Sequence, residues 1–429
     1  MKEIELIDSG VQWIREVPKN WTRVRCKDVL RETKIQVGED SSKYTLLSLT
    51  INGIIVRDLS ESKGKFPKEF NTYKIVKPNE LVFCLFDVDE TPRTVGLVTQ
   101  EGMLTGAYSV FSVRNVDVNF LYRYFISLDD RKALKPLYRG LRKVIPLPAF
   151  LSMPIYLPSL AEQRTIADWL DAKCADIDAA IELQQRMIDK LKAYKTAVIH
   201  QVVTKGLDKN ANLKDSGVQW IGEVPEHWEV CKLSYCFNQI GSGTTPKYSE
   251  EVRGEEGIAW IQSGDLNDGV LKSTKHLLPK EVISQYSVLK IYKQPFIAVA
   301  MYGASIGKTS LSLIDACTNQ ACCVLADSKG DLQYSFYVML SLKSLLIYLG
   351  IGGGQPNISQ AIIKQQCIPL PPLTEQRAIA DWLDAKCADI DATIALKEQK
   401  QEKLKAYKKT IIFEYVTGKK QVTNINKQL

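Results

Sequence analysis

One stretch of the chain decides its fold: Glu162-Gln-Arg-Thr-Ile-Ala-Asp-Trp-Leu-Asp-Ala-Lys-Cys-Ala-Asp-Ile-Asp178. It returns, with one substitution, as Glu375-Gln-Arg-Ala-Ile-Ala-Asp-Trp-Leu-Asp-Ala-Lys-Cys-Ala-Asp-Ile-Asp391. A shorter lead segment also occurs twice, as Asp8-Ser-Gly-Val-Gln-Trp-Ile14 and as Asp215-Ser-Gly-Val-Gln-Trp-Ile221. The residues between the matched blocks are unlike in the two copies. The chain is therefore an internal repeat in which one scaffold holds two different globular inserts.

A long helix is predicted after each insert, over about residues 162–203 and 375–416. Apolar side chains recur there at alternating spacings of three and four, as at Leu170, Cys174 and Ile177, which is the heptad pattern of helices that pack on one another. A helix of about 40 residues is roughly 60 Å long, so we expect the two helices to pack together. Ser159 is the predicted cap of the first helix, and Thr374 that of the second.

Polar residues interrupt the apolar seam of both helices, and two explanations stay open. The side chains could extend to the rim of the helix pair and keep their polar ends in water. Alternatively, helices of a partner could complete a bundle around them, which is the explanation we favour. The residues are Gln184, Lys195, Lys397, Gln401 and Lys408.

The repeat predicts an α/β (α+β) fold with two similar globular domains, each followed by a long helix. The helices pack as an antiparallel coiled coil with pseudo-two-fold symmetry, which places one insert at each end. We expect four parts: residues 1–158 and 206–371 as the globular domains, and residues 159–205 and 372–429 as the helical segments, the last with a C-terminal tail.

Short apolar segments between glycine turns predict the strands of both inserts, and longer apolar segments predict a helix in each. We expect the two inserts to share a fold and to differ in their loops. The predicted strands are Tyr44–Leu49, Glu80–Phe86, Tyr108–Val113, Ile258–Gln262, Phe296–Ala300 and Ala321–Leu325, and the predicted helices are Val118–Ser127 and Leu332–Leu346.

Composition is that of an ordinary globular protein. The chain has 429 residues, of which 45% are hydrophobic and 24% charged. No segment has the length and apolarity of a signal peptide or a membrane span, and the ten cysteines are too sparse for a disulfide framework. We therefore expect a cytoplasmic protein with reduced thiols and no membrane partner. The net charge of +7 is compatible with a polyanion but does not require one.

Two glycine-containing loops deserve comparison with phosphate-binding motifs. Gly303-Ala-Ser-Ile-Gly-Lys-Thr309 is one residue too short between its glycines for a phosphate loop, so a glycine turn is predicted. Gly350-Ile-Gly-Gly-Gly-Gln-Pro-Asn-Ile-Ser-Gln360 either caps a helix that starts near Ser359 or approaches DNA with its amides. Its counterpart, Tyr138-Arg-Gly-Leu-Arg-Lys143, is cationic, and is either a solvated basic loop or a phosphate or guanine contact.

The sequence gives little support for catalysis. The three histidines have no spacing that would place them with cysteines as zinc ligands. No nucleophile elbow of the Gly-x-Ser-x-Gly type is present. The paired carboxylates of the long helices are explained better by a solvated helix face than by chemistry.

Taken in order, several motifs resemble the DNA-specificity subunit of type I restriction–modification systems, over nearly the whole chain. In the second insert and its helix these are Trp260-Ile-Gln-Ser-Gly-Asp-Leu266, Ala300-Met-Tyr-Gly-Ala-Ser-Ile-Gly-Lys308, Thr318-Asn-Gln-Ala-Cys322, Gly353-Gly-Gln-Pro-Asn-Ile-Ser359 and Ile368-Pro-Leu-Pro-Pro-Leu-Thr-Glu-Gln-Arg377. The first insert matches another branch, through Leu85-Phe-Asp-Val-Asp-Glu-Thr-Pro-Arg-Thr-Val95 and Leu137-Tyr-Arg-Gly-Leu-Arg-Lys143. It lacks the Gln-Pro-Asn-Ile-Ser loop.

The resemblance implies two target-recognition domains, each reading one half of a bipartite asymmetric site in double-stranded DNA. The helices would set the gap and dock two methyltransferase subunits, and nuclease/translocase subunits would join them. No cofactor is expected in this chain: S-adenosylmethionine, ATP and Mg²⁺ would belong to the partner subunits. The chain would thus be noncatalytic by itself.

Candidate contact residues follow from the motifs and from the repeat. Polar positions such as Glu162, Gln163 and Asp176 are expected to be exposed, and their identity in both helices suggests two equivalently bound copies of one partner. For DNA the candidates are Arg93, Arg139, Arg142, Lys143, Lys247, Tyr302, Ser305, Lys308, Gln355, Asn357 and Ser359. For the methyltransferase they are Glu162, Gln163, Arg164, Asp168, Asp171, Glu375, Gln376, Arg377, Asp381 and Asp384.

Two other classes of function compete with DNA reading. An enzyme such as a nuclease or methyltransferase would modify DNA unaided, and the missing motifs argue against it. A coiled-coil adaptor whose inserts bind proteins would have no DNA sequence selectivity.

Overall fold

The structure is a computed structural model that describes residues 5–57, 70–247, 256–350 and 357–422. The chain forms two compact units. Unit 1 comprises residues 1–185 and 399–429, and unit 2 comprises residues 186–398. Both long helices contribute residues to both units, so the boundary between the units falls inside each predicted helical segment. The four-part division stays a prediction.

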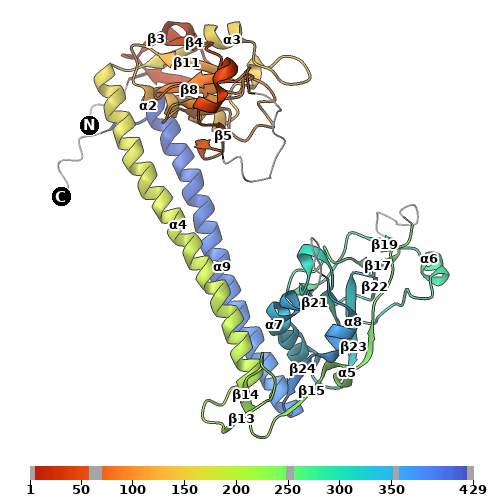
Figure 1. Cartoon of the computed structure of the whole chain (residues 1–429). Helices are drawn as coiled ribbons and strands as arrows, with labels where there is room; N and C mark the ends of the chain where they lie inside the picture. Colours follow the sequence, from red (N-terminus) through yellow and green to blue (C-terminus); the bar gives the residue numbers. More distant parts are fainter. Residues whose placement is uncertain (1–4, 58–69, 248–255, 351–356, 423–429) are drawn as a thin grey trace. The chain divides into compact units, whose positions relative to one another are not determined.

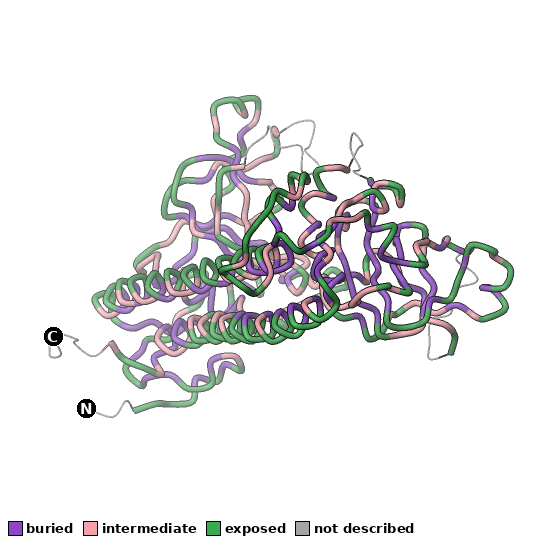
Figure 2. Tube along the Cα trace, turned by 90° about the horizontal axis from the view of Figure 1, so that it is seen from below, coloured by how far each residue is buried: buried purple, intermediate pink, exposed green. Residues whose placement is uncertain are grey.

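The long helices are α4 (Leu160–Lys205) and α9 (Leu373–Val416), which confirms both predicted helices. Within unit 1, the first part of α4 lies antiparallel to the last part of α9, and Trp169 stacks on Tyr415 with ring centroids 4.1 Å apart. Within unit 2, the last part of α4 lies antiparallel to the first part of α9. Buried and exposed residues alternate along each helix (Figure 2), as the heptad pattern predicts.

Two lysines of the seam form equivalent ion pairs between the helices. In unit 1 the Lys408 ammonium lies 2.6 Å from an Asp178 carboxylate oxygen, and in unit 2 Lys195 lies 2.7 Å from Asp391. These two positions therefore need neither a partner helix nor a free end in water. The two glutamines of the seam form no such ion pair. Gln401 donates to the Ile181 carbonyl at 3.4 Å, and Gln184 is buried.

The insert of unit 1 is built on a four-stranded antiparallel sheet in the order β4-β11-β8-β9. Helices α2 and α3 cover it, and Phe83 is central to the core, with its ring centroid 4.9 Å from those of Phe125 and Phe150. The elements are β4 (Leu30–Thr33), β8 (Glu80–Phe83), β9 (Val95–Leu97), β11 (Ser109–Val113), α2 (Val118–Asp130) and α3 (Leu147–Ser152), with two-stranded ladders β5 (Leu47–Thr50) with β6 (Gly53–Val56) and β7 (Lys74–Val76) with β10 (Gly102–Leu104).

The insert of unit 2 contains a five-stranded sheet, β16-β23-β20-β21-β18, beside a three-stranded sheet, β19-β17-β22 (Figure 1). Helix α7 packs on the larger sheet. The elements are β16 (Phe237–Gly241), β17 (Ile258–Ile261), β18 (Val270–Leu271), β19 (Leu277–Leu278), α6 (Lys280–Gln285), β20 (Phe296–Ala300), β21 (Thr309–Ser312), β22 (Ala316–Thr318), β23 (Cys322–Ser328), α7 (Leu332–Tyr348) and α8 (Gln360–Gln365). All six predicted strands and both predicted helices overlap observed elements.

Each unit also carries the same small frame around its insert. A lead hairpin, β1 (Leu6–Asp8) with β2 (Glu16–Pro18), is matched by β13 (Leu213–Asp215) with β14 (Glu223–Pro225). A ladder of β3 (Thr22–Arg25) with β12 (Pro154–Leu157) is matched by β15 (Glu229–Lys232) with β24 (Cys367–Leu370). Short helices α1 (Cys26–Val29) and α5 (Leu233–Cys236) follow β3 and β15. The sequence repeat is therefore a repeat of structure.

The end of a long helix completes each frame. In unit 1, Gly418 lies so close to Pro18 and Trp21 that an added Cβ would come within 2.4 Å of the proline ring. In unit 2, Gly206 lies against Trp228, and an added Cβ would come within 3.0 Å of that ring. Both glycines have positive φ angles, which glycine adopts without strain. Close packing and backbone conformation thus both favour glycine after each helix.

The starts of the long helices differ in one respect from the prediction. Ser159 precedes α4 and its hydroxyl accepts a hydrogen bond from the Glu162 amide at 3.3 Å, as expected. Helix α9 begins at Leu373, so Thr374 lies inside it and the prediction that Thr374 caps the helix is wrong. Instead, the Gln376 side chain donates to the Pro371 carbonyl at 2.8 Å and tethers this turn to the preceding strand.

Candidate nucleic-acid and partner interfaces

The candidate DNA site of unit 1 is a tight hairpin over residues 138–144. Arg139 and Val144 exchange two backbone hydrogen bonds of 2.8 and 3.0 Å, and Gly140 and Lys143 adopt positive φ angles in the turn. The tip residue Leu141 is fully exposed, at 102%. The hairpin therefore holds its side chains on a defined projection from the insert.

The cations of this hairpin face an acidic loop of the same insert. Arg142 lies 3.1 Å from Asp87, and Lys143 lies 3.2 Å from Asp89. The Asp89 carboxyl loses some hydration, which raises its pKa, but hydrogen bonds and charge from Lys143 and Lys135 outweigh this and hold the pKa below its usual value. Exposed ion pairs of this kind are weak and screened by salt. A phosphate group could therefore exchange with these carboxylates.

Arg93 has a different position from the other predicted cations. Its guanidinium lies 3.2 Å from Asp129 and 3.0 Å from Asp130, and its side chain is only 17% exposed. The Asp129 carboxylate also accepts hydrogen bonds from the amide and hydroxyl of Thr94. Arg93 thus has a structural role at the junction of α2 and β9, which the sequence motif did not indicate.

In unit 2, two separate motifs meet at one place. Tyr302 and Asn357 form an isolated antiparallel bridge, and the Ile358 amide donates to the Met301 carbonyl at 2.9 Å. The Tyr302 and Asn357 side chains are both exposed, and Ser305 and Lys308 follow in the same turn, half-buried. The fold therefore brings two of the predicted DNA contacts, Tyr302 and Asn357, side by side, with Ser305 and Lys308 in the adjoining turn.

The remaining predictions for this surface have mixed outcomes. Ser359 is the N-cap of α8, and its hydroxyl accepts from the Ile362 amide at 3.3 Å, so the capping alternative for this residue is confirmed. Lys247 is exposed but already takes part in an interaction within the chain. Gln355 lies outside the described residues. A DNA contact by these three residues stays a prediction.

The glycine turn after β20 is confirmed as a turn. Residues 303–305 form a short 3₁₀ turn that joins β20 to β21, and these strands pair antiparallel. A phosphate loop instead leads from a strand into a helix. The backbone geometry therefore removes the nucleotide-binding reading of this motif.

Gln163 and Gln376 are buried, which corrects the expectation that these positions are exposed. Each donates its side-chain amide at 2.8 Å to a proline carbonyl just before its own helix. Each also accepts a backbone amide at the N-cap of an insert helix: Asp117 at 2.9 Å and Asp331 at 2.8 Å. One glutamine in each unit therefore joins the insert to the long helix, and structure alone explains why both copies have it.

Other predicted docking residues divide into engaged and available ones. Asp171 pairs with Arg123 at 2.6 Å, and its counterpart Asp384 accepts from the Tyr337 hydroxyl at 2.5 Å. Glu375 accepts from the Trp228 indole at 2.9 Å and contacts His227 at 2.7 Å, and both Glu375 and its counterpart Glu162 are half-buried. Exposed positions that match in the two helices include Arg164 with Arg377 and Asp168 with Asp381.

Exposed apolar residues on the helices were missed by the sequence reasoning. Leu183 and its counterpart Leu396 are 48% and 65% exposed, and Tyr194 and its counterpart Tyr407 are each 49% exposed. Their identity in both copies was the available signal, because burial in the helix pair does not require it. Together with the matched charged positions, they are candidates for the surface on which a partner docks.

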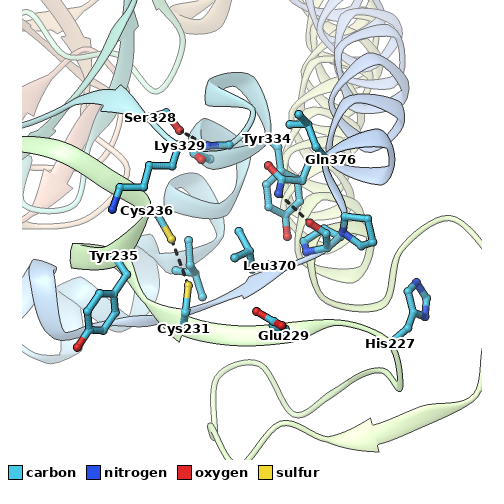
Figure 3. A pocket seen from close by; sticks show the side chains of 16 residues that line it. His227, Glu229, Cys231, Tyr235, Cys236, Ser328, Lys329, Tyr334, Leu370 and Gln376 are labelled. Carbon is cyan, nitrogen blue, oxygen red and sulfur yellow. Dashed lines mark hydrogen bonds between the residues drawn. The ribbon is translucent and has the colours of Figure 1, made fainter.

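A cavity of about 510 Å³ lies in unit 2 between the β15–β24 ladder, α5 and the start of α9 (Figure 3). Its lining includes Cys231, Cys236, Lys329, Tyr334 and Gln376. The Tyr334 hydroxyl donates to backbone carbonyls, and burial holds its pKa well above the usual range. The cavity is therefore lined by structural groups and by two thiols.

Two features that would indicate other functional classes are absent from the described ranges. Among those residues, no three histidine, cysteine or carboxylate side chains are grouped as a metal site would require. No helix in the described part of the chain is both long and apolar enough to cross a membrane.

Comparison with known proteins gives these interfaces a context. Residues 225–406 match the family model described as type I restriction modification DNA specificity domain. The chain is 29% identical over 428 residues to the type I restriction enzyme MjaVIII specificity subunit of Methanocaldococcus jannaschii, covering 96% of this chain and 95% of that protein. It is 27% identical over 210 residues to the type I restriction enzyme EcoKI specificity subunit of Escherichia coli, covering 46% of this chain and 44% of that protein.

A solved structure shares the fold. It is described as "Structural basis underlying complex assembly and conformational transition of the type I R-M system". The TM-score is 0.70 over 94% of this chain and 99% of that chain, at 16% sequence identity. Similarity at this identity supports the mixed helix and sheet architecture with two long helices.

Proposed function

Because the chain is similar to type I restriction–modification specificity subunits, we propose that it belongs to their family and reads a bipartite asymmetric site in double-stranded DNA. The insert of unit 1 reads one half-site and the insert of unit 2 reads the other. The chain performs no chemistry itself. It directs adenine methylation by two docked methyltransferase subunits and, with nuclease/translocase subunits, restriction of unmodified DNA.

The observation that carries this proposal is the meeting of Tyr302 and Asn357 on one surface of unit 2. An exposed asparagine can form paired hydrogen bonds with adenine in the major groove. An adjacent tyrosine and Lys308 suit contacts to the DNA backbone. The bipartite geometry itself is our inference from the repeat, since two unlike inserts on matched frames suit two unlike half-sites.

The surface of unit 1 offers a different chemistry. Arg139, Arg142 and Lys143 are cationic, and cations such as these favour phosphate or guanine. Two of these cations are paired with Asp87 and Asp89, so DNA must compete with carboxylates there. Because these three cations can contact more phosphates than Lys308 can alone, we expect half-site reading by unit 1 to depend more strongly on salt than reading by unit 2.

Docking of the methyltransferase uses the positions that are exposed and identical on both helices. These are Arg164 with Arg377, Asp168 with Asp381, Leu183 with Leu396 and Tyr194 with Tyr407. A partner that binds both helices in the same way would meet the same side chains twice. S-adenosylmethionine, ATP and Mg²⁺ act in the partner subunits, and the helices set the gap between half-sites.

The test is a selection from randomised duplex DNA with this chain co-purified with its methyltransferase. Two short fixed motifs at a constant gap are the expected result. One contiguous motif would overturn the bipartite reading while keeping DNA recognition. An intact complex that enriches no sequence would instead favour a coiled-coil adaptor without DNA selectivity.

A further inference from the structure

Two cysteines of unit 2 lie in direct contact. Cys231 is in β15 and Cys236 ends α5, and their sulfur atoms are 3.2 Å apart (Figure 3). Both side chains line the cavity of about 510 Å³ beside the start of α9. Cys231 is half-buried and Cys236 is buried. The first thiol is thus the more accessible of the two, and the second lies directly behind it.

The internal repeat shows that the frame does not need these thiols. The equivalent positions in unit 1 are Val24 in β3 and Val29 in α1, and the same ladder and short helix form around them. A valine pair therefore satisfies the packing of this element. The thiol pair is a property that unit 2 has and unit 1 lacks.

The surroundings make Cys231 the more reactive thiol. Its hydrogen bond with Cys236 lowers its pKa despite partial burial. The same contact, with burial, raises the pKa of Cys236. Burial also raises the pKa of Cys317 and Cys323 to about 12. Because the thiolate is the nucleophile, a thiol whose pKa is lowered at an accessible cavity reacts before thiols of this buried kind.

We propose that Cys231 and Cys236 form an oxidative modification site whose reagent is a hydroperoxide. The Cys231 thiolate attacks the OH-bearing peroxide oxygen and becomes a sulfenic acid, while the O–O bond breaks and the other oxygen leaves, as hydroxide from hydrogen peroxide or as an alkoxide from an organic hydroperoxide. The Cys236 sulfur then attacks the Cys231 sulfur, the S–O bond breaks, and water leaves with the Cys236 proton. The product is a disulfide between β15 and α5: two thiols are oxidised and one peroxide is reduced.

The bond would form beside the segment that carries the proposed DNA contact of unit 2. Helix α5 packs against α8, and the Leu233 amide donates to the Gln366 carbonyl at 2.8 Å. Helix α8 begins directly after Asn357, Ile358 and its cap Ser359. A cross-link that holds α5 to β15 would therefore alter the support of Asn357. This consequence rests on the proposed function, whereas the thiol chemistry does not.

The primary experiment is peptide mapping of the full-length chain after brief treatment with dilute hydrogen peroxide. We expect a disulfide that joins the Cys231 and Cys236 peptides, formed at least about 10-fold faster than oxidation of any other thiol. The matched control is Cys231→Val with Cys236→Val, which installs the residues of unit 1 and should fold normally. Loss of other thiols first, or no bridged peptide, would overturn the proposal.

Single variants separate the two steps. Cys236→Val should leave a sulfenic acid at Cys231 that dimedone traps, because the second thiol is gone. Cys231→Val should leave Cys236 unmodified over the same time. Trapping at Cys236 instead would overturn the assigned roles. The DNA selection is then repeated on oxidised complex: a change in one half-site supports the link to reading, and a bridged chain with unchanged selection rejects that link alone.

Discussion

Units 1 and 2 have the same polar contacts at the joints between insert and long helix and between the two helices, but their inserts differ. Gln163 and Gln376 make the same pair of hydrogen bonds, and Lys408–Asp178 and Lys195–Asp391 are the same ion pair. The inserts share four antiparallel strands in the same order, β4-β11-β8-β9 and β16-β23-β20-β21, but unit 2 adds β18 and a three-stranded sheet. The glutamines fix where an insert attaches, and the additions to its sheet differ. Conserved polar residues in a repeat can thus be structural joints and need not be docking residues.

The largest effect should come from breaking the glutamine joint. Gln163→Leu keeps the apolar bulk but leaves a buried proline carbonyl and the Asp117 amide without their partner, so we expect a loss of about 2–4 kcal/mol of stability. Gln376→Leu should cost the same in unit 2. Denaturant unfolding measures the loss, and hydrogen exchange in α2 and α7 shows which unit is affected.

The neighbouring exposed arginines are the controls for this pair. Arg164→Ala and Arg377→Ala should change stability by less than about 0.5 kcal/mol. A large loss in one glutamine variant and none in the other would contradict the equivalence of the two joints.

The next largest effect should be a difference in stability between variants of the two glycines that follow the long helices. Gly418→Ala should destabilise unit 1 by about 2–4 kcal/mol, because a positive φ is combined with a collision against Pro18. Gly206→Ala should cost about 1–2 kcal/mol, because its Cβ meets the Trp228 ring at a wider 3.0 Å and Pro225 only at 4.0 Å. Thermal unfolding of both variants measures the difference.

Two glycines of the lead segments allow the cost of backbone strain to be measured apart from the cost of close packing. Gly10 and Gly217 also have positive φ angles, but an added Cβ at either would have no neighbour within 4 Å. Alanine there should cost only about 1–2 kcal/mol of strain. If Gly418→Ala is no worse than Gly10→Ala, close packing does not explain the glycine after α9.

The smallest expected effect is that acid destabilises unit 2 more than unit 1. All three histidines belong to unit 2, and burial, with the charge of Lys205, lowers the pKa of His200. Its folded-state pKa is below the unfolded value, so its contribution is present above the ordinary histidine pKa and is lost as pH falls below it. After correction for the intrinsic pH dependence of exchange, protection of α7 should therefore fall between pH 7 and 5 more than that of α2.

The equivalent residue in the other helix supplies the variant for this test. Phe413 occupies the position of His200 in α9, so His200→Phe removes the titrating group with a residue that the frame accepts. The variant should reduce the acid sensitivity of α7. An unchanged pH profile would assign the effect to other groups.

The sequence predicted those features of the fold that local patterns determine. The heptad spacing located both long helices, and apolar segments located strands such as β20 and β11 because their period and flanking turns are local signals. The Ser159 cap followed from capping-box spacing. For Tyr44–Leu49 the strand begins later, at Leu47, because boundaries depend on the partner strand.

Contacts between residues far apart in the chain could not be predicted from the sequence. Gln163 lies seven residues before Leu170, in line with the apolar seam of the helix, but its bond to the distant Asp117 amide could not be predicted from that pattern. The carboxylates beside Arg93 and Arg142 likewise come from other elements. The meeting of Tyr302 and Asn357 depends on a bridge between segments far apart in the chain. Motif order suggested these residues, but only the fold brings them to one surface.

The central claim is that the two inserts read DNA separately, and a paired selection tests it most directly. Complexes carrying Asn357→Ala or Arg142→Ala are each selected against randomised duplex DNA, beside the unchanged complex. We predict that Asn357→Ala relaxes one half-site, by about 1–3 kcal/mol of base discrimination, and that Arg142→Ala affects only the other, with the gap constant. Equal loss at both half-sites in either variant would contradict separate reading.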